Sequence, residues 1–183
     1  MRIVVIGTSG AGKTTLAREL ARRLGVTHIE IDALHWEANW TATPADRLRA
    51  KVQAALNAAE DGWSCDGNYS TVRELIWSRA DLIVWLDYSM TITFTRVFRR
   101  TLSRWWNGEV LWNGNREQLW MHFLHRDSLL LWVITTWRRR RRDYPKLLRS
   151  HQCARKILRF REPAQTQQWL QSIATHQARS FPC

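Results

Sequence analysis

The sequence predicts an α/β fold with a five-stranded parallel sheet and helices on both of its faces. Short apolar, β-branched stretches alternate along the chain with stretches whose apolar residues recur at helical spacing. Strands that alternate with helices pair in parallel, because each helix returns the chain to the same edge of the sheet. The 183 residues contain no internal repeat and no low-complexity linker, which predicts a single domain over residues 1–183.

The first strand, a glycine-rich loop and the first helix follow one another directly. Residues 2–6 are apolar and β-branched, as expected of a buried strand. Residues 7–14 read G-T-S-G-A-G-K-T, which matches the full phosphate-loop pattern G-x-x-x-x-G-K-[ST]. In residues 15–24 the apolar positions form one helix face, and Gly25 supplies the helix stop.

This loop is suited to hold the phosphates of a nucleoside triphosphate. Its backbone N–H groups converge on a phosphate, and the helix N-terminus adds partial positive charge. Lys13 can reach the β- and γ-phosphates, and the Thr14 hydroxyl can bind Mg²⁺. The predicted nucleotide-binding residues are Gly7, Thr8, Ser9, Gly10, Ala11, Gly12, Lys13, Thr14 and Thr15.

The same alternation continues to the fourth strand. Residues 26–32 read as a second strand that ends in Asp32, and Thr43 and Pro44 as N-cap and first residue of a helix. Residues 63–65 form a third strand that leads into the segment Asp66-Gly67-Asn68-Tyr69. A short helix near 72–79 precedes a fourth strand at 82–86, which Asp87 closes.

The second half begins with a long helix at about 91–104. An irregular, glycine-bearing stretch follows, and then a helical region at 117–149 that Pro145 would break. Residues 156–160 are the fifth strand, and Pro163 begins the last helix. Ligands of such sheets bind beyond the carboxyl ends of the strands, so the phosphate loop, Asp32, Asp66 and Asp87 share one rim.

Cysteine usage and hydropathy predict a cytoplasmic location. The three cysteines form no C-x-x-C pair, which argues against a disulfide framework or a zinc site. The chain starts directly with a strand, without a secretory signal, and its most apolar stretch, 129–134, is too short to span a bilayer. We therefore expect no membrane partner.

The net charge of +12 makes a polyanion the first partner to consider. Five arginines, residues 138–142, lie in a row on a predicted helix and point all round it, so we expect a solvated helix end, with nucleic-acid binding as the alternative. Of the 12 tryptophans, eight fall between residues 77 and 137. They line a core or cleft in one interpretation and stack on bases in the other.

Several segments resemble adenylate-kinase-like phosphotransferases. Gly62-Trp63-x-x-Asp66-Gly67 is similar to their G-[FW]-x-x-D-G segment, and Leu86-Asp87 followed by Arg96 and Arg100 resembles the strand and helix before their lid. More narrowly, residues 31–36 and D-G-N-Y resemble the DNA topology modulation proteins. The resemblance implies the three-layer P-loop NTPase fold of nucleoside-monophosphate kinases, with a helical lid insertion at about 101–125, and ATP and Mg²⁺ as cofactors.

The resemblance also implies roles for four side chains besides Lys13. Asp66 would hold Mg²⁺ together with Thr14, with a turn cap as the alternative. Asp32 would bind or deprotonate an attacking hydroxyl, unless it is only a solvated strand end. Arg96 and Arg100, four residues apart, would clamp the transferred phosphoryl group, with a solvated helix face as the alternative. Weaker candidates are His35, Trp36, Arg73 and Arg116.

The leading hypothesis is therefore transfer of the γ-phosphoryl group of ATP to a small acceptor. Asn68-Tyr69 replaces the Phe-Pro-Arg of adenylate kinases, which shifts the expected acceptor from a nucleotide toward a hydroxyl-bearing metabolite or nucleoside. The competing hypothesis is a nucleotide-dependent nucleic-acid-binding protein that affects DNA topology. The acceptor, the choice of ATP or GTP, turnover itself and the oligomeric state are left open.

Overall fold

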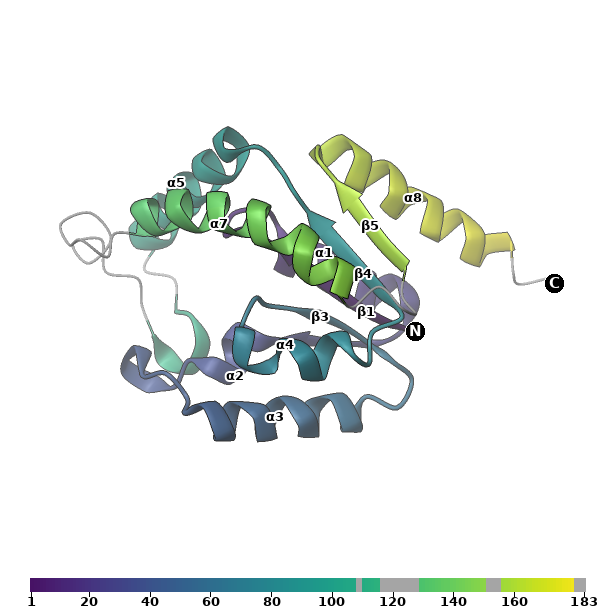
Figure 1. Cartoon of the computed structure of the whole chain (residues 1–183), viewed down its shortest axis with the longest axis horizontal. Coiled ribbons are helices and arrows are strands. Elements are labelled where there is room, and N and C mark those ends of the chain that lie inside the picture. The colour runs from purple at the N-terminus through teal and green to yellow at the C-terminus, as the bar shows by residue number, and fades with distance from the viewer. Residues whose placement is uncertain (108–109, 116–128, 151–155, 180–183) are drawn as a thin grey trace.

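The computed structural model describes residues 1–107, 110–115, 129–150 and 156–179 of the chain. Its centre is a five-stranded sheet in which every neighbouring pair of strands is parallel, in the order β2-β3-β1-β4-β5 (Figure 1). The strands are β1 (Arg2–Gly7), β2 (Thr27–Glu30), β3 (Trp63–Asp66), β4 (Leu82–Leu86) and β5 (Lys156–Phe160). The predicted five-stranded parallel α/β fold is confirmed.

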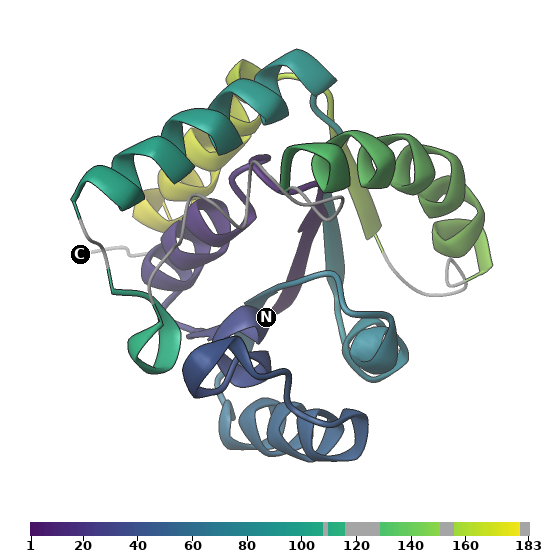
Figure 2. The same ribbon diagram turned by 90° about the vertical axis from the view of Figure 1, so that its left-hand side faces the viewer.

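Helices connect the strands and cover both faces of the sheet. The described helices are α1 (Lys13–Leu24), α2 (Ile31–His35), α3 (Ala45–Ala58), α4 (Ser70–Trp77), α5 (Met90–Trp106), α7 (Leu129–Ser150) and α8 (Pro163–Arg179). Two single 3₁₀ turns, η1 (Ala38–Trp40) and η2 (Trp112–Gly114), lie in the connections that follow α2 and α5. Figure 2 shows α1 and α8 on one side of the sheet and α4 and α7 on the other.

Two hydrophobic cores result, one on each face, because successive side chains of a strand point in opposite directions. On β1, Val4 and Ile6 join the core beneath α3, α4 and α7, whereas Ile3 and Val5 join the core beneath α1 and α8. The central strands are buried on both faces, which explains why they read as continuous apolar runs.

Three of the tryptophans lie in these cores, as the first interpretation predicts. Trp63, Trp77 and Trp85 are buried, and the rings of Trp77 and Trp85 each meet the edge of Tyr144 from α7. Trp105 and Trp106, at the end of α5, are exposed instead. The contacts of Trp77 and Trp85 with Tyr144 therefore pack α7 against the sheet, whereas the end of α5 is exposed to solvent.

The second strand and the helix after it differ from the prediction. β2 pairs with β3 only as far as Glu30, and the chain then turns into α2, so Asp32 lies in the first turn of a helix and not at a strand end. The predicted cap at Thr43 is wrong. Its hydroxyl donates to Leu34 O, 3.1 Å away, and Pro44 is the N-cap residue of α3 without a side-chain cap bond.

The second half of the chain agrees with the prediction where it is described. α7 continues through Pro145, so the expected break does not occur, although proline supplies no N–H for the helix. The part of the predicted helical region at 117–128, and with it much of the predicted lid insertion at about 101–125, lies outside the described residues. The single-domain prediction stays a prediction.

Gly10 places the phosphate loop directly against α5. Its φ is +80°, and a Cβ atom there would lie 2.3 Å from Thr93 O and 2.7 Å from Val97 Cγ2. Gly114 has the same φ of +80° with nothing within 4 Å of such an atom. Both positions therefore have left-handed backbone, but only Gly10 is also closely packed, so comparing the two separates the effect of backbone strain from the effect of packing.

We expect Gly10→Ala to destabilise the protein more than Gly114→Ala. Left-handed backbone should cost both variants about 1–2 kcal/mol, and the clash with α5 should lower the free energy of unfolding of Gly10→Ala by about 1–3 kcal/mol more. Urea denaturation measures both values. Equal losses would show that the loop does not pack against α5 as described.

Candidate active site

The phosphate loop joins β1 to α1 and leaves the N-terminus of that helix open. α1 begins at Lys13 with no side-chain cap and no acidic residue in its first turn. The loop is closed by a hydrogen bond of 3.1 Å from Ala11 N to Thr8 O, and the Lys13 ammonium folds back to donate to the same oxygen over 3.3 Å. The first N–H groups of α1 are thus available to an anion.

Asp66, at the end of β3, lies beside this loop and is almost fully buried, with 1% of its surface exposed. The Thr14 hydroxyl donates to its Oδ2 atom over 2.5 Å, and His28 Nε2 on β2 lies 2.9 Å from its Oδ1 atom. Both carboxylate oxygens are therefore held, one by the helix after the phosphate loop and one by the neighbouring strand.

The three residues after Asp66 each contact a different part of the site. Gly67 has φ +146°, and a Cβ atom there would lie 2.6 Å from Ile31 Cβ, so β3 can approach α2 only with glycine at this position. The Asn68 amide donates to Gly7 O at the start of the phosphate loop. The Tyr69 hydroxyl donates to Asp32 Oδ1 over 2.7 Å.

Asp32 is therefore positioned through Tyr69 rather than through a strand. Burial raises the pKa of the Tyr69 hydroxyl, and the negative charge of Asp32 raises it further, so Tyr69 keeps its proton and remains a hydrogen-bond donor. His35 packs between Tyr69 and Trp36, with ring centroids 4.3 and 4.7 Å away. Burial lowers the pKa of His35, which favours a neutral ring beside Asp32.

Arg96 and Arg100 lie on the face of α5 that borders the phosphate loop. The Arg96 guanidinium donates to Ala11 O over 3.4 Å and lies 5.5 Å from the centre of the Tyr88 ring. The positive charge of Arg100 acts on the Lys13 ammonium. The structure thus brings this predicted pair to the loop. Arg116 lies outside the described residues.

Arg140 of α7 also reaches this rim, although the sequence indicated a solvated run. The run divides: Arg138, Arg139 and Arg142 are exposed, whereas Arg140 is half-buried and Arg141 lies 3.4 Å from Asp87 Oδ1. Burial lowers the pKa of Arg140. The charge of Arg140 also acts on Lys13, whose pKa falls to about 8. Burial of the Lys13 ammonium is the largest cause and the charge of Arg140 the next, whereas Asp32 and Asp66 raise this pKa.

Two residues that lie at this rim were therefore missed by the sequence analysis, Arg140 and His28. For Arg140 a signal existed, because Thr136, Arg140, Tyr144 and Leu148 fall at intervals of four on α7 and the other three are buried. His28 had no comparable signal, since its contact with Asp66 depends on the register between β2 and β3.

Asp87 lies at the same rim as predicted but binds arginines of the fold. The Arg159 guanidinium donates to Asp87 Oδ2 through both Nε, at 3.0 Å, and Nη2, at 2.5 Å, and lies over the Trp85 ring. Arg141 contacts the other oxygen. Asp87 thus fixes β5 and α7 to β4. None of these contacts turns its carboxylate toward the phosphate loop.

A side-chain clamp joins the segment after α5 to the segment after α2. Asn115 accepts a hydrogen bond from Trp40 N and donates to Glu37 O and Trp112 O, each over 2.9 Å. The rings of Trp40 and Trp112 meet edge to face beside it, with centroids 6.4 Å apart. The two 3₁₀ turns are therefore held together at the edge of the site.

Taken together, the sheet order and the phosphate loop followed by an uncapped helix define a P-loop protein with the fold of the nucleoside-monophosphate kinase type. The predicted three-layer fold of the nucleoside-monophosphate kinase type is confirmed. A family model described as "AAA domain" matches residues 3–120, more than half of the chain, and the chain belongs to this family.

Known proteins similar to this chain include several with kinase names. The chain is 29% identical over 127 residues to the uncharacterized protein YqaC of Bacillus subtilis (strain 168), covering 69% of this chain and 71% of that one. It is 41% identical over 73 residues to the gluconokinase of Gluconobacter oxydans (strain 621H), covering 31% of this chain and 41% of the enzyme. The narrower resemblance to DNA topology modulation proteins stays a prediction.

A solved structure shares the fold over nearly the full length. The shikimate kinase from Acinetobacter baumannii in complex with shikimate aligns with a TM-score of 0.55 and 18% sequence identity, covering 99% of this chain and 95% of that one. Within the described residues, no helix has the length and apolar character needed to cross a membrane.

The lowered pKa of Lys13 predicts that nucleotide binding takes up a proton in alkaline solution. Phosphate charge favours the ammonium form, so binding of Mg-ATP should take up about one proton per protein at about pH 9 and few at about pH 7. Calorimetry in two buffers of different ionisation enthalpy measures this number. Lys13→Met should lose the difference between the two pH values, and its persistence in that variant would assign the proton to another group.

Proposed function

We propose that the protein transfers the γ-phosphoryl group of ATP to a hydroxyl group of a small acceptor. The observation that carries the proposal is the position of Asp32. Tyr69 holds its Oδ1 atom, and its charge acts on Lys13 of the phosphate loop, so a second, oriented carboxylate lies beside the loop. Kinases need such a group, because phosphoryl transfer is mainly a matter of positioning and charge stabilisation.

Thr14 and Asp66 fit the requirements of Mg²⁺ in this proposal. Both offer hard oxygen atoms beside the loop, and among the described residues no three His, Cys, Asp or Glu side chains gather to hold a metal by themselves. Mg²⁺ commonly keeps several waters and binds one or two protein groups together with substrate phosphates. When bound, it would neutralise charge on the phosphates.

The remaining side chains then have separate tasks. The Oδ2 atom of Asp32, which Tyr69 does not hold, accepts the hydrogen bond of the acceptor hydroxyl and takes its proton as the new phosphate ester forms. Lys13 binds the phosphates of the donor. Arg96 and Arg100 stabilise the charge that spreads over the transferred group, since both face the loop from α5.

Two observations support a hydroxylated metabolite as the acceptor. The similar proteins named above include a gluconokinase and a shikimate kinase, whose names specify small hydroxylated acceptors. Within this chain, Asn68-Tyr69 replaces the Phe-Pro-Arg of adenylate kinases, and the Tyr69 hydroxyl binds Asp32.

We expect Asp32→Asn to abolish most acceptor-dependent turnover. Loss of a positioned base should lower kcat for ADP release by about 10²–10⁴-fold, while the affinity for a fluorescent ATP analogue stays unchanged. Tyr69→Phe, which keeps the ring but frees Asp32 Oδ1, should lower kcat by about tenfold. ADP release, measured with a panel of sugars, sugar acids, nucleosides and nucleotides, tests both expectations.

Two controls sharpen this experiment. Lys13→Met should weaken nucleotide binding and lower turnover together, which separates the donor site from the acceptor site. Asp81→Asn removes a carboxylate that contacts Arg2 N at the opposite end of the sheet and should leave kcat unchanged. The proposal fails if no member of the panel raises ADP release above the rate with water alone.

The exposed face of α7 favours a second candidate, nucleic-acid binding. Arg138, Arg142 and Lys146 follow one another at intervals of four on this helix, and all three are exposed. The five consecutive arginines could not form one stripe by themselves, but Arg138 and Arg142 together with Lys146 form a stripe along the exposed face. Such a row of cations suits the phosphates of a nucleic-acid backbone.

If this face binds DNA, Arg138→Glu/Lys146→Glu should weaken binding and flatten its salt dependence. Each lost phosphate contact should change the slope of log K against log salt by about 0.9. Fluorescence anisotropy with a labelled duplex of mixed sequence measures this slope. The control Arg47→Glu/Arg49→Glu changes the net charge equally on exposed positions of α3, and an equal loss there would reduce the effect to overall charge.

A further inference from the structure

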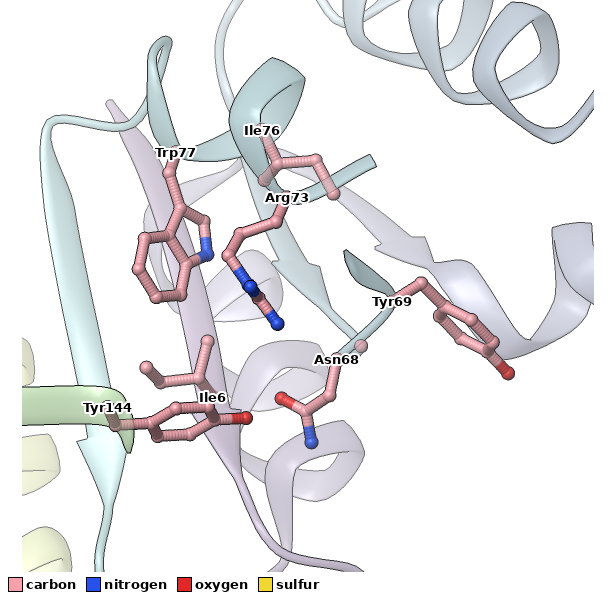
Figure 3. Close-up of a pocket in the computed structure, with 8 residues that line it drawn as sticks. Ile6, Asn68, Tyr69, Arg73, Ile76, Trp77 and Tyr144 are labelled. Carbon is pink, nitrogen blue, oxygen red and sulfur yellow. The ribbon is translucent and has the colours of Figure 1, made fainter. Parts of the chain in front are cut away.

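A small pocket lies on the α4 and α7 side of the phosphate loop. It is lined by Gly67, Asn68 and Tyr69 after β3, by Arg73 and Trp77 of α4, and by Tyr144 of α7, with Ile6 and Ile76 completing its wall. Figure 3 shows Arg73, Asn68 and Tyr144 turned toward one another around this space. The proposed transfer step does not use it.

Arg73 brings an uncompensated positive charge to the pocket. Its guanidinium lies over the Trp77 ring, 5.6 Å from the ring centre, and within the described part of the chain it forms no ion pair with a carboxylate. Nearby cations add to this charge rather than offset it. Arg139 and Arg140 act on Tyr144 together with Arg73, and Arg73 contributes to lowering the pKa of the half-buried Arg140.

Asn68 adds a hydrogen-bond acceptor without a partner. Its amide nitrogen donates to Gly7 O, which fixes the orientation of the group, and its Oδ1 atom is buried with no hydrogen bond in the described structure. Buried polar atoms are nearly always paired, so such an atom indicates a missing donor. Beside it, Tyr144 contributes a hydroxyl group that burial keeps protonated, since burial raises its pKa.

We propose that this pocket is a subsite for an anionic group of the acceptor, a carboxylate or a phosphate, with Arg73 as its counterion. The inference rests on the proposed function and extends it, because it assigns the acceptor to the class of hydroxylated acids or phosphate esters. An anion offers Arg73 charge-assisted hydrogen bonds. A hydroxyl group next to the anion supplies the donor that Asn68 Oδ1 lacks.

Tyr69 connects the subsite to the reacting centre. Tyr69 is one of the residues that line the pocket, and its side chain points away from Arg73 and Tyr144 (Figure 3), with its hydroxyl group on Asp32. An acceptor that places its anionic group at Arg73 extends past Tyr69 toward Oδ2 of Asp32. Repulsion between that carboxylate and the anion favours this orientation over the reverse one.

The size of the pocket suits one functional group and not a whole substrate. The space in it that a water-sized group can reach is about 10 Å³. Sites that enclose a complete ligand generally measure about 300–1,000 Å³. The rest of the acceptor must accordingly lie outside it, between the pocket and the phosphate loop.

The experiment compares acceptor probes that differ only in the anionic group. Glycerate and glycerol 3-phosphate are set against glycerol, and gluconate against glucitol. Because the phosphate loop itself binds anions, binding is measured by calorimetry with the loop saturated by a non-hydrolysable ATP analogue and Mg²⁺. ADP release with ATP is measured in parallel for each probe.

We expect the anionic probes to bind more tightly than their neutral partners in the native protein. Arg73→Met should weaken binding of the anionic probes by about 10- to 100-fold and leave the neutral probes and the ATP analogue unaffected. Arg79→Met is the matched control, since Arg79 follows the same helix but donates to Asn57 at 2.7 Å, away from the pocket. Glycerate against glycerol 3-phosphate separates a carboxylate from a phosphate.

The outcomes distinguish this inference from the proposed function. If no anionic probe binds, or if Arg73→Met weakens charged and neutral probes equally, the subsite is overturned, whereas acceptor-stimulated ADP release would still support a kinase. If anionic probes bind through Arg73 but none stimulates ADP release, the subsite stands as an anion site and the kinase proposal loses its support.

Discussion

The hydrogen bond between Thr14 and Asp66 is the contact on which the arrangement of the site depends. It joins the helix that follows the phosphate loop to the end of β3, and His28 fixes the other oxygen of the same carboxylate from β2. From this fixed point the chain runs through Gly67 and Asn68 to Tyr69. Those residues carry the constraint onward to α2, to the start of the loop and to Asp32. The short segment from Asp66 to Tyr69 thus fixes how the phosphate loop and Asp32 are placed relative to each other.

Charge is distributed unevenly around this segment. Lys13, Arg96, Arg100 and Arg140 converge on the phosphate loop. Burial lowers the pKa of Lys13 most, and repulsion from Arg140 and Arg100 lowers it further. Such crowding costs stability in the free protein. A triphosphate relieves the repulsion, so part of the electrostatic free energy stored in the fold is returned when an anion binds. Asp87 takes no part in this balance, because Arg141 and Arg159 occupy it and anchor α7.

The sequence was informative wherever local pattern decides the structure. The loop motif and the apolar runs located all five strands, most clearly β1, β3 and β4, which are central and buried. Asp32 was placed in the wrong element, since the end of β2 is set by pairing with β3 and by the close approach of Gly67. Arg140 and His28 escaped notice for a related reason. Their roles arise from which helix or strand lies opposite, and a single sequence carries little information about such long-range partners.

The clamp at Asn115 has a mechanical consequence. The buried Asn115 side chain accepts a hydrogen bond from Trp40 N and donates to Glu37 O and Trp112 O, so neither 3₁₀ turn can be displaced without breaking bonds to the other. The two turns belong to different connections, one after α5 and one after α2. A ligand that shifts either turn must therefore do work on both. By thermodynamic reciprocity, the two ligands of such a site would influence each other's affinity equally.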